Sequence, residues 1–418
     1  MHINSLKHIT KHALIENIPD PPEFYLPLYG YKGVLKTVVE TGQYVKKYEL
    51  VAQAEDLFST AMHAPASGIM EGVEIIDGKP HLKLVNDFKE AAIDLSLQQS
   101  EHLKPLEILQ ILKQYGIEGS GGARFPTHLK YSLAHQNVDV FIINGAECEP
   151  YLTADYALMQ NKTEALFKSI ISIQKIIKAK KVVFGIEKQN KELATILKSY
   201  YSLCDFPVEV KLLPNTYPQG GELQLIKSIT KKELPKGSRP LEHGIVLSNI
   251  GTLWAIYNAL FQNKPYIERV ITLSGEKAIK KGNFYVKIGT PVSHLFDLSA
   301  ADTQKHQIVL GGPMMGKAIT DFKSPVTKGT GGVLILPEIQ NEKYNCIECG
   351  YCANACPQRL MPMEFARYAK TDNKEQLLSH RLTDCIECGA CAYICPSDVP
   401  LMRSIYHGKE ILQNTIAL

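Results

Sequence analysis

The chain has 418 residues, of which 45% are hydrophobic and 21% charged, the composition of a globular protein with about two to four domains. Lys and Arg (46) exceed Asp and Glu (43) by only three charges, which is too few to indicate binding to nucleic acid or to an acidic lipid surface. Eight of the 10 cysteines lie between Cys346 and Cys395, which excludes a disulfide framework spread along a short secreted chain and favours metal binding.

The chain has no evident targeting or membrane-spanning segment. Its first twenty residues contain neither an apolar core of about 7–15 residues nor a small-residue cleavage site. No stretch approaches the run of about 18 apolar residues that a membrane span needs. Lysines interrupt the most hydrophobic region, 165–186, which we predict to be an amphipathic helix followed by a buried strand. We therefore expect a soluble, cytoplasmic chain that reaches a membrane only through a partner protein.

The N-terminal part of the chain is rich in strand-like runs. We assign residues 1–25 to an N-terminal extension and residues 26–100 to a β unit with glycine turns. The segments TGQYVKKYELVAQAE and MHAPASGIMEGVE resemble the half-repeats of biotinyl- and lipoyl-type sandwich domains. The expected hairpin tip, Asp56 to Ser59, has no lysine to carry a cofactor. We therefore predict a structural β unit with a sandwich-hybrid fold.

Residues 101–265 have the alternating pattern of an α/β domain. Apolar residues at helical spacing begin at Pro105. The short apolar runs DVFIIN and KVVFGI have the length of buried strands, and the helical stretch TEALFKSIISIQKII lies between them. A strand, a helix and a second strand in this order predict a βαβ unit with parallel pairing.

Residues 266–335 form a second β-rich segment. The run from Glu268 to Phe296 predicts two or three strands with a glycine-centred turn, followed by a short helix. The run IVLGGPMMG adds a strand and another glycine turn. With the cysteine-rich domain at 336–418, the expected architecture is multidomain, combining α/β and α+β parts.

A glycine loop lies between the first predicted helix of the α/β domain and its first strand. Gly119, Gly121 and Gly122 belong to the segment GSGGARFPT, in which Pro126 can begin a helix. Such a loop ahead of a helix N-terminus suits a phosphate. It is not the dinucleotide fingerprint, because a helix precedes it and Arg124 occupies the position of the third glycine. By itself, the loop is equally well interpreted as an ordinary turn.

Polar or glycine residues also lie in three loops that follow predicted strands of the α/β domain. Because open α/β sheets bind ligands at the carboxyl ends of their strands, the three loops together predict a nucleotide or flavin crevice. Any one of them alone is equally well interpreted as a plain loop. The residues concerned are Asn144, Glu147, Glu149, Gly220, Gly221 and Asn249.

The C-terminal domain contains the pattern C-x2-C-x2-C-x3-C-P twice, beginning at Cys346 and at Cys385. Three cysteines at this spacing can wrap one four-iron cube, and the fourth, followed by proline, points to the neighbouring cube. Neither paired zinc ligands nor disulfides fit the doubled pattern. We therefore assign one [4Fe–4S] cluster to Cys346, Cys349, Cys352 and Cys395 and the other to Cys385, Cys388, Cys391 and Cys356.

The residues outside the two motifs refine this picture. The stretch between the motifs has a helical pattern, so the domain resembles helical dicluster ferredoxin domains. Cys148 and Cys204 lie outside the motifs and are expected to be small buried side chains. The predicted C-terminal helix LMRSIYHGKEIL is either a docking helix or a solvated one.

From about Leu26 onward, the order of motifs resembles that of the RnfC (RsxC) family, the C subunits of Rnf ion-translocating oxidoreductase complexes. The α/β domain is also similar to the flavin-binding subunit of respiratory NADH dehydrogenase, followed by an SLBB-like β-grasp segment. The segments that carry the resemblance are GGARFPTHLK, INGAECEPYLTAD, YPQGGE, LSNIGT, ERVITLSGE, GNFYVKIGTPV, GGPMMG, PVTKGT and the two copies of CIECG.

The resemblance implies a membrane-bound complex that passes electrons between NAD(H), FMN and two [4Fe–4S] clusters. This chain would be its peripheral subunit on the cytoplasmic side of the inner membrane, with partner subunits in the bilayer. Glu147 and Glu149 would be the catalytic carboxylates of the flavin–nicotinamide crevice. The implied cofactor-binding residues are Gly119, Gly121, Gly122, Asn144, Gly220, Gly221 and Asn249.

The glycine loop departs from the family pattern at one position. Related loops have the form G-x-G-G-A-G-F-P-T, whereas Arg124 precedes Phe125 here. A guanidinium could pair with a phosphate, or its bulk could crowd the ligand. Arg124 therefore leaves open an iron–sulfur scaffold without flavin. A second alternative is a cobalamin reductase of a microcompartment, whose family shares the glycine loop, the SLBB-like segment and the doubled cysteine motif.

Overall fold

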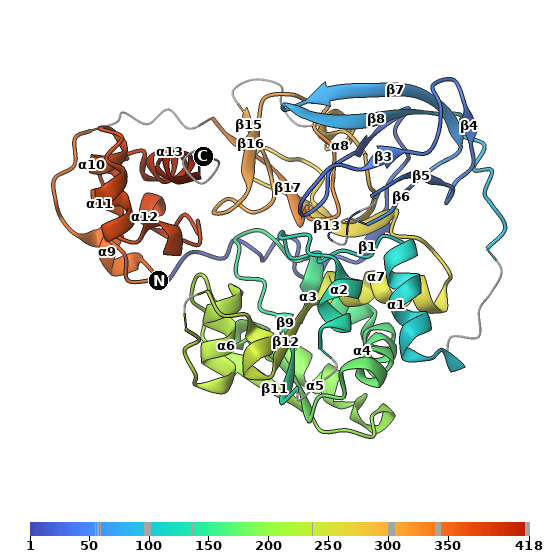
Figure 1. The fold of residues 1–418 in the computed structure, drawn as a ribbon, viewed down its shortest axis with the longest axis horizontal. Helices are drawn as coiled ribbons and strands as arrows, with labels where there is room; N and C mark the ends of the chain where they lie inside the picture. Colours follow the sequence, from blue (N-terminus) through green and yellow to red (C-terminus); the bar gives the residue numbers. More distant parts are fainter. Residues whose placement is uncertain are drawn as a thin grey trace.

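In the computed structural model, the described residues form four β-sheets, helices that accompany them and a helical C-terminal region; Figure 1 shows their arrangement. Leu57 and Ser59 of the expected hairpin tip lie outside the residues that the structure describes. The described residues are 1–54, 56, 58, 60–95, 102–134, 138–235, 237–299, 306–338 and 344–413.

Two antiparallel sheets form the predicted N-terminal β unit. Its longest hairpin joins β7 (Gly68–Ile76) to β8 (Lys79–Asn86) through Asp77 and Gly78, which both have positive φ. Asp-Gly favours this kind of turn, whose twist matches that of the strands. Buried apolar residues such as Phe24 and Met62 fill the unit. The other strands are β2 (Glu23–Pro27), β3 (Lys36–Thr37), β4 (Tyr44–Val45), β5 (Leu50–Gln53) and β6 (Met62–His63).

Four parallel strands form the sheet of the α/β core, which confirms the predicted βαβ pairing. The chain passes from β9 outward to β10 and β11, and then returns to the far side of β9 for β12. The strand order therefore reverses between β9 and β12, the position where open α/β sheets bind ligands. In sheet order the strands are β11 (Val208–Leu213), β10 (Lys181–Glu187), β9 (Val140–Gly145) and β12 (Ile245–Asn249).

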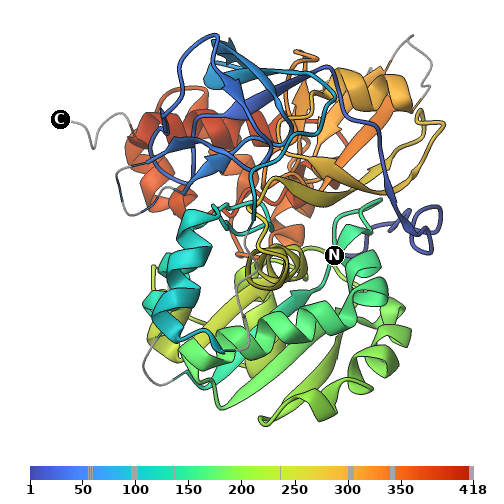
Figure 2. The ribbon, with the colours of Figure 1, turned by 90° about the vertical axis from the view of Figure 1, so that its right-hand side faces the viewer.

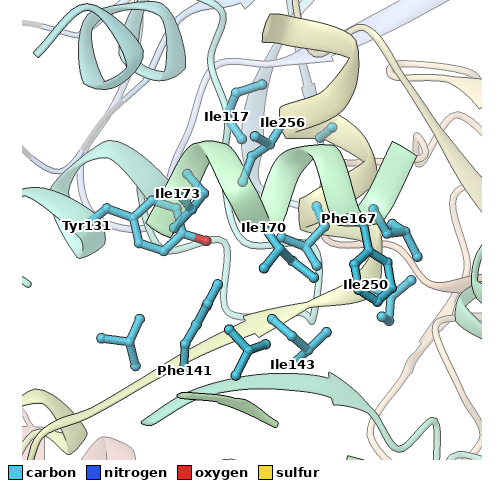
Figure 3. Close-up of a cluster of buried hydrophobic side chains, with 14 of the residues drawn as sticks. Ile117, Tyr131, Phe141, Ile143, Phe167, Ile170, Ile173, Ile250 and Ile256 are labelled. Carbon is cyan, nitrogen blue, oxygen red and sulfur yellow. The ribbon is translucent and has the colours of Figure 1, made fainter. Parts of the chain in front are cut away.

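Helices cover both faces of this sheet. Phe141 and Ile143 of β9 point into one apolar layer, and Val140 and Ile142 point into the other, because successive strand side chains alternate between faces. Figure 3 shows the first layer, where one helix packs Phe167 and its neighbours against the sheet. That layer contains α1 (Pro105–Gln114), α2 (Thr127–Ser132), α3 (Ala154–Asn161), α4 (Thr163–Ile177), α5 (Glu192–Lys198) and α7 (Ile250–Phe261). The opposite face is covered by α6 (Glu222–Thr230).

A six-stranded sheet follows the α/β core in the sequence. It includes the strands that were predicted for Glu268–Phe296, and the short helix predicted after them is also present. The helix, α8 (Val292–Leu298), packs apolar residues against one face of the sheet. The N-terminal strand β1 forms one edge of the sheet, and the residues before it contact the α/β core through Met1 and Lys7. In sheet order the strands are β1 (Ile15–Asn17), β14 (Gly282–Lys287), β13 (Glu268–Ser274), β17 (Gly332–Pro337), β15 (His306–Leu310) and β16 (Lys317–Ile319).

The C-terminal region is helical and surrounds a small apolar core that includes Phe365 and Ile405. Figure 1 shows it next to β15, β16 and β17 of the six-stranded sheet, and in Figure 2 it lies behind the N-terminal strands. No helix among the described residues is long and apolar enough to cross a membrane. The helices are α9 (Tyr351–Ala355), α10 (Pro362–Ala369), α11 (Lys374–Ser379), α12 (Ala390–Tyr393) and α13 (Leu401–Gln413). Short 3-10 turns occur at η2 (Lys188–Asn190), η3 (Tyr201–Leu203), η4 (Pro240–His243) and η5 (Leu382–Asp384).

Candidate functional site

The eight clustered cysteines line two cavities in the C-terminal region. One cavity, called the first cavity, is lined by Cys346, Cys349, Cys352 and Cys395. The other, called the second cavity, is lined by Cys356, Cys385, Cys388 and Cys391. The structure therefore brings together the same two sets of cysteines that the spacing predicts, and the last cysteine of each motif faces the cavity of the other motif.

The walls of both cavities combine four cysteine thiols with apolar side chains. Apolar residues such as Phe365 and Leu401 complete the walls. Burial raises the pKa of the Cys391 thiol to about 12, so its thiolate form depends on positive charge placed beside it.

The two CIECG loops share one backbone conformation. Glu348 and Glu387 both have a φ of 56°, and the glycines that precede α9 and α12 have φ values of 75° and 73°. Glycine adopts this left-handed conformation without a steric penalty. The repeat in the sequence is therefore a repeat in structure, and each loop wraps one cavity.

The second cavity adjoins the α/β core. The Tyr217 hydroxyl, from the loop after β11, donates a 2.6 Å hydrogen bond to the carbonyl oxygen of Cys388. A Cβ at Gly389 would lie only 2.4 Å from the carbonyl oxygen of Met314, so glycine allows this close approach. By contrast, residues 344–349 of the first cavity's loop are all exposed.

The glycine loop closes on itself and faces the start of α7. The Gly119 N–H donates to the Phe125 carbonyl (2.9 Å), and the Ser120 N–H donates to Thr252 Oγ1 (2.9 Å). Gly122 has a φ of 101°, and its absent Cβ would have no atom within 4 Å. The loop thus borders open space with bare backbone, as close approach to a phosphate requires.

Arg124 is turned toward the N-terminal β unit. Its Nε donates to the Glu118 carboxylate (2.8 Å), its Nη2 donates to the Tyr29 carbonyl (3.0 Å), and the residue is 8% exposed. Its φ of 55° is left-handed, a conformation that glycine adopts more easily. The sequence left open whether the guanidinium pairs with a phosphate or crowds the ligand; in the structure it is bound by Glu118 and Tyr29.

The loops after β9 and β11 meet at the carboxyl edge of the sheet. Asn144 Nδ2 donates to the Gly220 carbonyl (2.9 Å), and the Gly220 N–H donates to Cys148 Sγ (3.2 Å). A Cβ at Gly220 would lie 2.1 Å from the Ala146 carbonyl oxygen, which explains the glycine. Gly221 precedes α6 as its N-cap. Burial raises the pKa of Cys148 to about 12, as fits an unreactive buried thiol.

The start of α7 lies beside the glycine loop. A Cβ at Gly121 would lie 3.6 Å from Asn249 Cβ. Asn249 Oδ1 accepts from the Gly251 N–H (2.8 Å) and its Nδ2 donates to Asp155 (2.6 Å), so both ends of the amide are held. The predicted residues Gly121 and Asn249 are therefore neighbours, at the point where the strand order reverses.

The two predicted catalytic carboxylates are both held by backbone amides. Glu147 accepts from the N–H groups of Asp155 (3.2 Å) and Tyr156 (3.3 Å) and so caps α3. Glu149 accepts from the N–H groups of Met314 (3.0 Å) and Met315 (2.9 Å) in the GGPMMG loop. Glu149 therefore joins the α/β core to the six-stranded sheet, and the catalytic role of either carboxylate remains a prediction.

The sequence analysis missed three charged residues near the carboxyl edge of the parallel sheet. Lys130 Nζ donates to the Leu247 carbonyl (3.2 Å), and burial lowers its pKa. Lys7 is buried, donates to the Glu147 carbonyl and lies 4.0 Å from Glu187. The third is Asp155. Lys130 and Asp155 belong to GGARFPTHLK and YLTAD, segments that could have directed attention to them, whereas nothing near Lys7 in the sequence does so.

The pKa of Asp155 leads to a stability prediction. Burial, with a smaller contribution from the neighbouring Glu147, raises this pKa to about 7 from its ordinary value of 3.8. As pH rises between these values, the unfolded chain loses a proton that the folded chain keeps, so the free energy of unfolding falls. Asp155→Asn removes this loss and should make the protein more stable at pH 7.5, by at most about 4 kcal/mol.

Urea unfolding at pH 5.5 and 7.5 measures this difference through the fluorescence of Trp254, the single tryptophan, which lies in α7. The gain should be smaller at pH 5.5. Asp139→Asn is the control, because Lys180 lowers the pKa of this exposed carboxyl and the variant should gain nothing. A stability difference for Asp155→Asn that is the same at both pH values would contradict the prediction.

Two buried polar atoms, each at the start of a helix that follows a predicted loop, suit a polar ligand. Thr127 Oγ1, at the start of α2 directly after the glycine loop, has no hydrogen-bond partner among the described residues. The same holds for Gln224 Oε1 in the first turn of α6. Buried polar atoms are normally hydrogen-bonded, so these two atoms, the bare loop backbone and Lys130 together fit a phosphate-bearing cofactor such as FMN.

Three family models match the chain. Residues 1–85 match the RnfC barrel sandwich hybrid domain. Residues 112–258 match the Nuo51 FMN-binding domain, and residues 345–399 match the 4Fe–4S dicluster domain. The chain thus combines an FMN-binding domain with a dicluster iron–sulfur domain, and the multidomain fold predicted from the sequence is confirmed.

Curated relatives match over most of the chain. The C subunit of the proton-translocating ferredoxin:NAD(+) oxidoreductase complex of Clostridium ljungdahlii is 35% identical over 87% of this chain and 82% of its own length. The C subunit of the ion-translocating oxidoreductase complex of Haemophilus influenzae (strain PittEE) is 34% identical over 96% of this chain and 64% of its own length. Its Vibrio cholerae counterpart is 36% identical over 88% and 49%. The chain therefore spans about half to two thirds of the length of these last two relatives.

Solved structures share the fold. A chain of the NAD+-reducing [NiFe]-hydrogenase in its H2-reduced state superposes with a TM-score of 0.55, at 19% identity, over 75% of this chain and 63% of that chain. The air-oxidized state gives a TM-score of 0.51 at 20% identity, over 69% and 54%. At these identities the similarity concerns the fold alone.

Proposed function

Because the chain belongs to the family of C subunits of ion-translocating oxidoreductase complexes, we propose that it passes electrons between NAD(H) and the other subunits of such a complex. FMN in the α/β core and two [4Fe–4S] clusters in the C-terminal region would be its cofactors. FMN, when bound, exchanges two electrons with NAD(H) and single electrons with iron–sulfur clusters, which accept only one.

The hydrogen bond from Tyr217 to the Cys388 carbonyl carries this proposal. Tyr217 belongs to the loop that also contains Gly220, at the carboxyl edge of the parallel sheet, and Cys388 lines the second cavity. The Tyr217 hydroxyl therefore links a loop at the carboxyl edge of the parallel sheet to a residue that lines the second cavity. We assign the second cavity to the cluster that exchanges electrons with the flavin, and the first cavity, with its exposed loop, to the cluster that faces the partner.

In this proposal the chain's residues bind and orient the cofactors. The glycine loop and Lys130 hold the phosphate side of the flavin, and Asn144 and Asn249 fix the two strand-end loops on either side of β9. The apolar walls of the cavities exclude water and tune the potentials of the clusters. The proposed cofactor residues are Gly119, Gly121, Gly122, Asn144, Gly220, Gly221 and Asn249. The proposed cluster ligands are the eight cysteines of the two cavities.

We further propose that the chain is peripheral to the cytoplasmic side of the cell membrane and reaches the bilayer through its partner subunits. The six-stranded sheet would be the SLBB-type segment between the flavin and cluster domains. The domain boundaries proposed from the sequence, at about residues 25, 100, 265 and 335, divide the chain accordingly.

One set of measurements on the anaerobically reconstituted full chain tests the proposal. We expect about eight irons per chain, from two four-iron clusters, together with bound flavin and NADH-dependent reduction of an artificial acceptor. Full iron without flavin or NADH activity would reduce the chain to an iron–sulfur scaffold. One or two zinc ions in place of iron would overturn the cluster assignment.

A further inference from the structure

We propose that a buried ion triad of Glu118, Arg124 and Lys328 positions the glycine loop for flavin binding. These are positioning residues, because their charged groups bind one another and backbone carbonyls of the protein. The inference rests on the proposed function, since it concerns the affinity of the same loop for FMN. It assigns a role to the one position at which this loop departs from its family pattern.

The triad closes the base of the loop. Backbone pairing of Glu118 with Pro126, and the Gly119 N–H bond to the Phe125 carbonyl, bring the two ends of the loop together. Arg124 Nε then donates to the Glu118 carboxylate across the same base (2.8 Å). The ion pair therefore fixes the width of the loop whose tip, residues 121–123, is exposed.

Lys328, from the loop before β17, connects the six-stranded sheet to the base of the glycine loop. Its ammonium donates to the carbonyl oxygens of Ala61 (2.9 Å) and Gly116 (2.8 Å) and lies 3.4 Å from Glu118 Oε1. Glu118 and Lys328 are each 1% exposed. Buried charges are stable only when they are paired and hydrogen-bonded, so each of these groups depends on the others being in place.

The N-terminal β unit also contacts the triad, through Thr60 and Tyr29. The Thr60 hydroxyl donates to Glu118 Oε1, and the Tyr29 carbonyl accepts from Arg124 Nη2. Three separate parts of the chain therefore meet at one carboxylate. These contacts explain how Arg124 keeps a left-handed φ of 55° although it is not glycine. A strained backbone conformation is stable where several surrounding contacts hold it in place. The shape of the loop thus depends on how the three parts are docked.

The test measures FMN affinity of the full chain with its clusters in place, by fluorescence titration. Glu118→Gln leaves two buried cations facing each other, and its Kd for FMN should rise by about tenfold or more, which is about 1.4 kcal/mol. Adding Lys328→Met to that variant removes one of the cations, so the double variant should bind FMN more tightly than Glu118→Gln alone. Purely structural damage would instead add up, and a double variant that binds more weakly would overturn the inference.

A milder pair of variants covers the case in which Glu118→Gln does not fold. Arg124→Met removes the guanidinium but keeps a side chain at the left-handed position, and its FMN Kd should rise several-fold. Arg359→Met is the matched control, because Arg359 has the same φ of 55° but is exposed and pairs with Glu233 at the surface (3.5 Å). Equal FMN affinities for the wild type and Arg124→Met would overturn the inference. A wild-type chain that binds no FMN would overturn the proposed function itself, before any variant is made.

Discussion

Replacing Cys356 with alanine should remove the cluster of the second cavity and leave the cluster of the first cavity intact, although Cys356 belongs to the first motif. Cys356 lines the second cavity with Cys385, Cys388 and Cys391. Since each cluster needs four thiolates, iron should fall from about eight to about four per chain. Iron and sulfide analysis, together with the electron paramagnetic resonance of the remaining cluster, measures the loss.

The reciprocal variant and a neutral one complete this test. Cys395→Ala should remove the first cavity's cluster and spare the second, because Cys395 lines the first cavity. Cys204→Ala should lose no iron, because Cys204 lies in the α/β core, next to its apolar layer. If Cys356→Ala instead destroyed the cluster of Cys346, Cys349 and Cys352, ligation would follow the motifs and the crossed assignment would be wrong.

The same two variants should behave oppositely when electrons are supplied by NADH. In Cys395→Ala the second cavity's cluster, next to Tyr217, should still be reduced on mixing. In Cys356→Ala the remaining cluster is the one behind the exposed loop, and its reduction by NADH should fall to background because the intermediate carrier is missing. Rapid mixing followed by freezing and electron paramagnetic resonance distinguishes the two.

Chemical reduction is the control for the order in which the two clusters receive electrons. Dithionite should reduce the remaining cluster in both variants, which separates a broken path from a damaged cluster. Prompt reduction by NADH of the cluster that remains in Cys356→Ala would mean that the flavin serves the first cavity directly. The order assigned to the two cavities would then be wrong.

Several elements of the fold could be predicted from local sequence because their cause is local. The helix predicted at TEALFKSIISIQKII is α4 (Thr163–Ile177), whose apolar residues recur at helical spacing. DVFIIN and KVVFGI became the central strands β9 and β10, since short apolar runs of this kind suit a sheet covered on both faces. β1 had no such signal, because three residues at a sheet edge carry too short a pattern to recognise.

The candidate site was predictable only in part. Its glycines and asparagines stood out because turns and strand ends favour those residue types. The partners of its charged groups did not, because they come from distant segments. Glu149 receives its hydrogen bonds from Met314 and Met315, and Lys7 reaches the loop after β9 from the N-terminal segment. No spacing rule connects residues that are more than a hundred positions apart.

The sequence by itself determined the chemistry of the cysteines. Their spacing predicts two four-thiol sets, because a loop of three cysteines and a displaced fourth leaves few ways to surround two cubes. Only the tertiary structure decided which cavity adjoins the α/β core, because that depends on Tyr217 meeting Cys388 across the chain. It also decided where the Arg124 side chain lies. The sequence left open whether the guanidinium pairs with a phosphate or crowds the ligand, whereas in the structure it lies 2.8 Å from the buried carboxylate of Glu118, because a buried charge is stable only beside a partner that neutralises it.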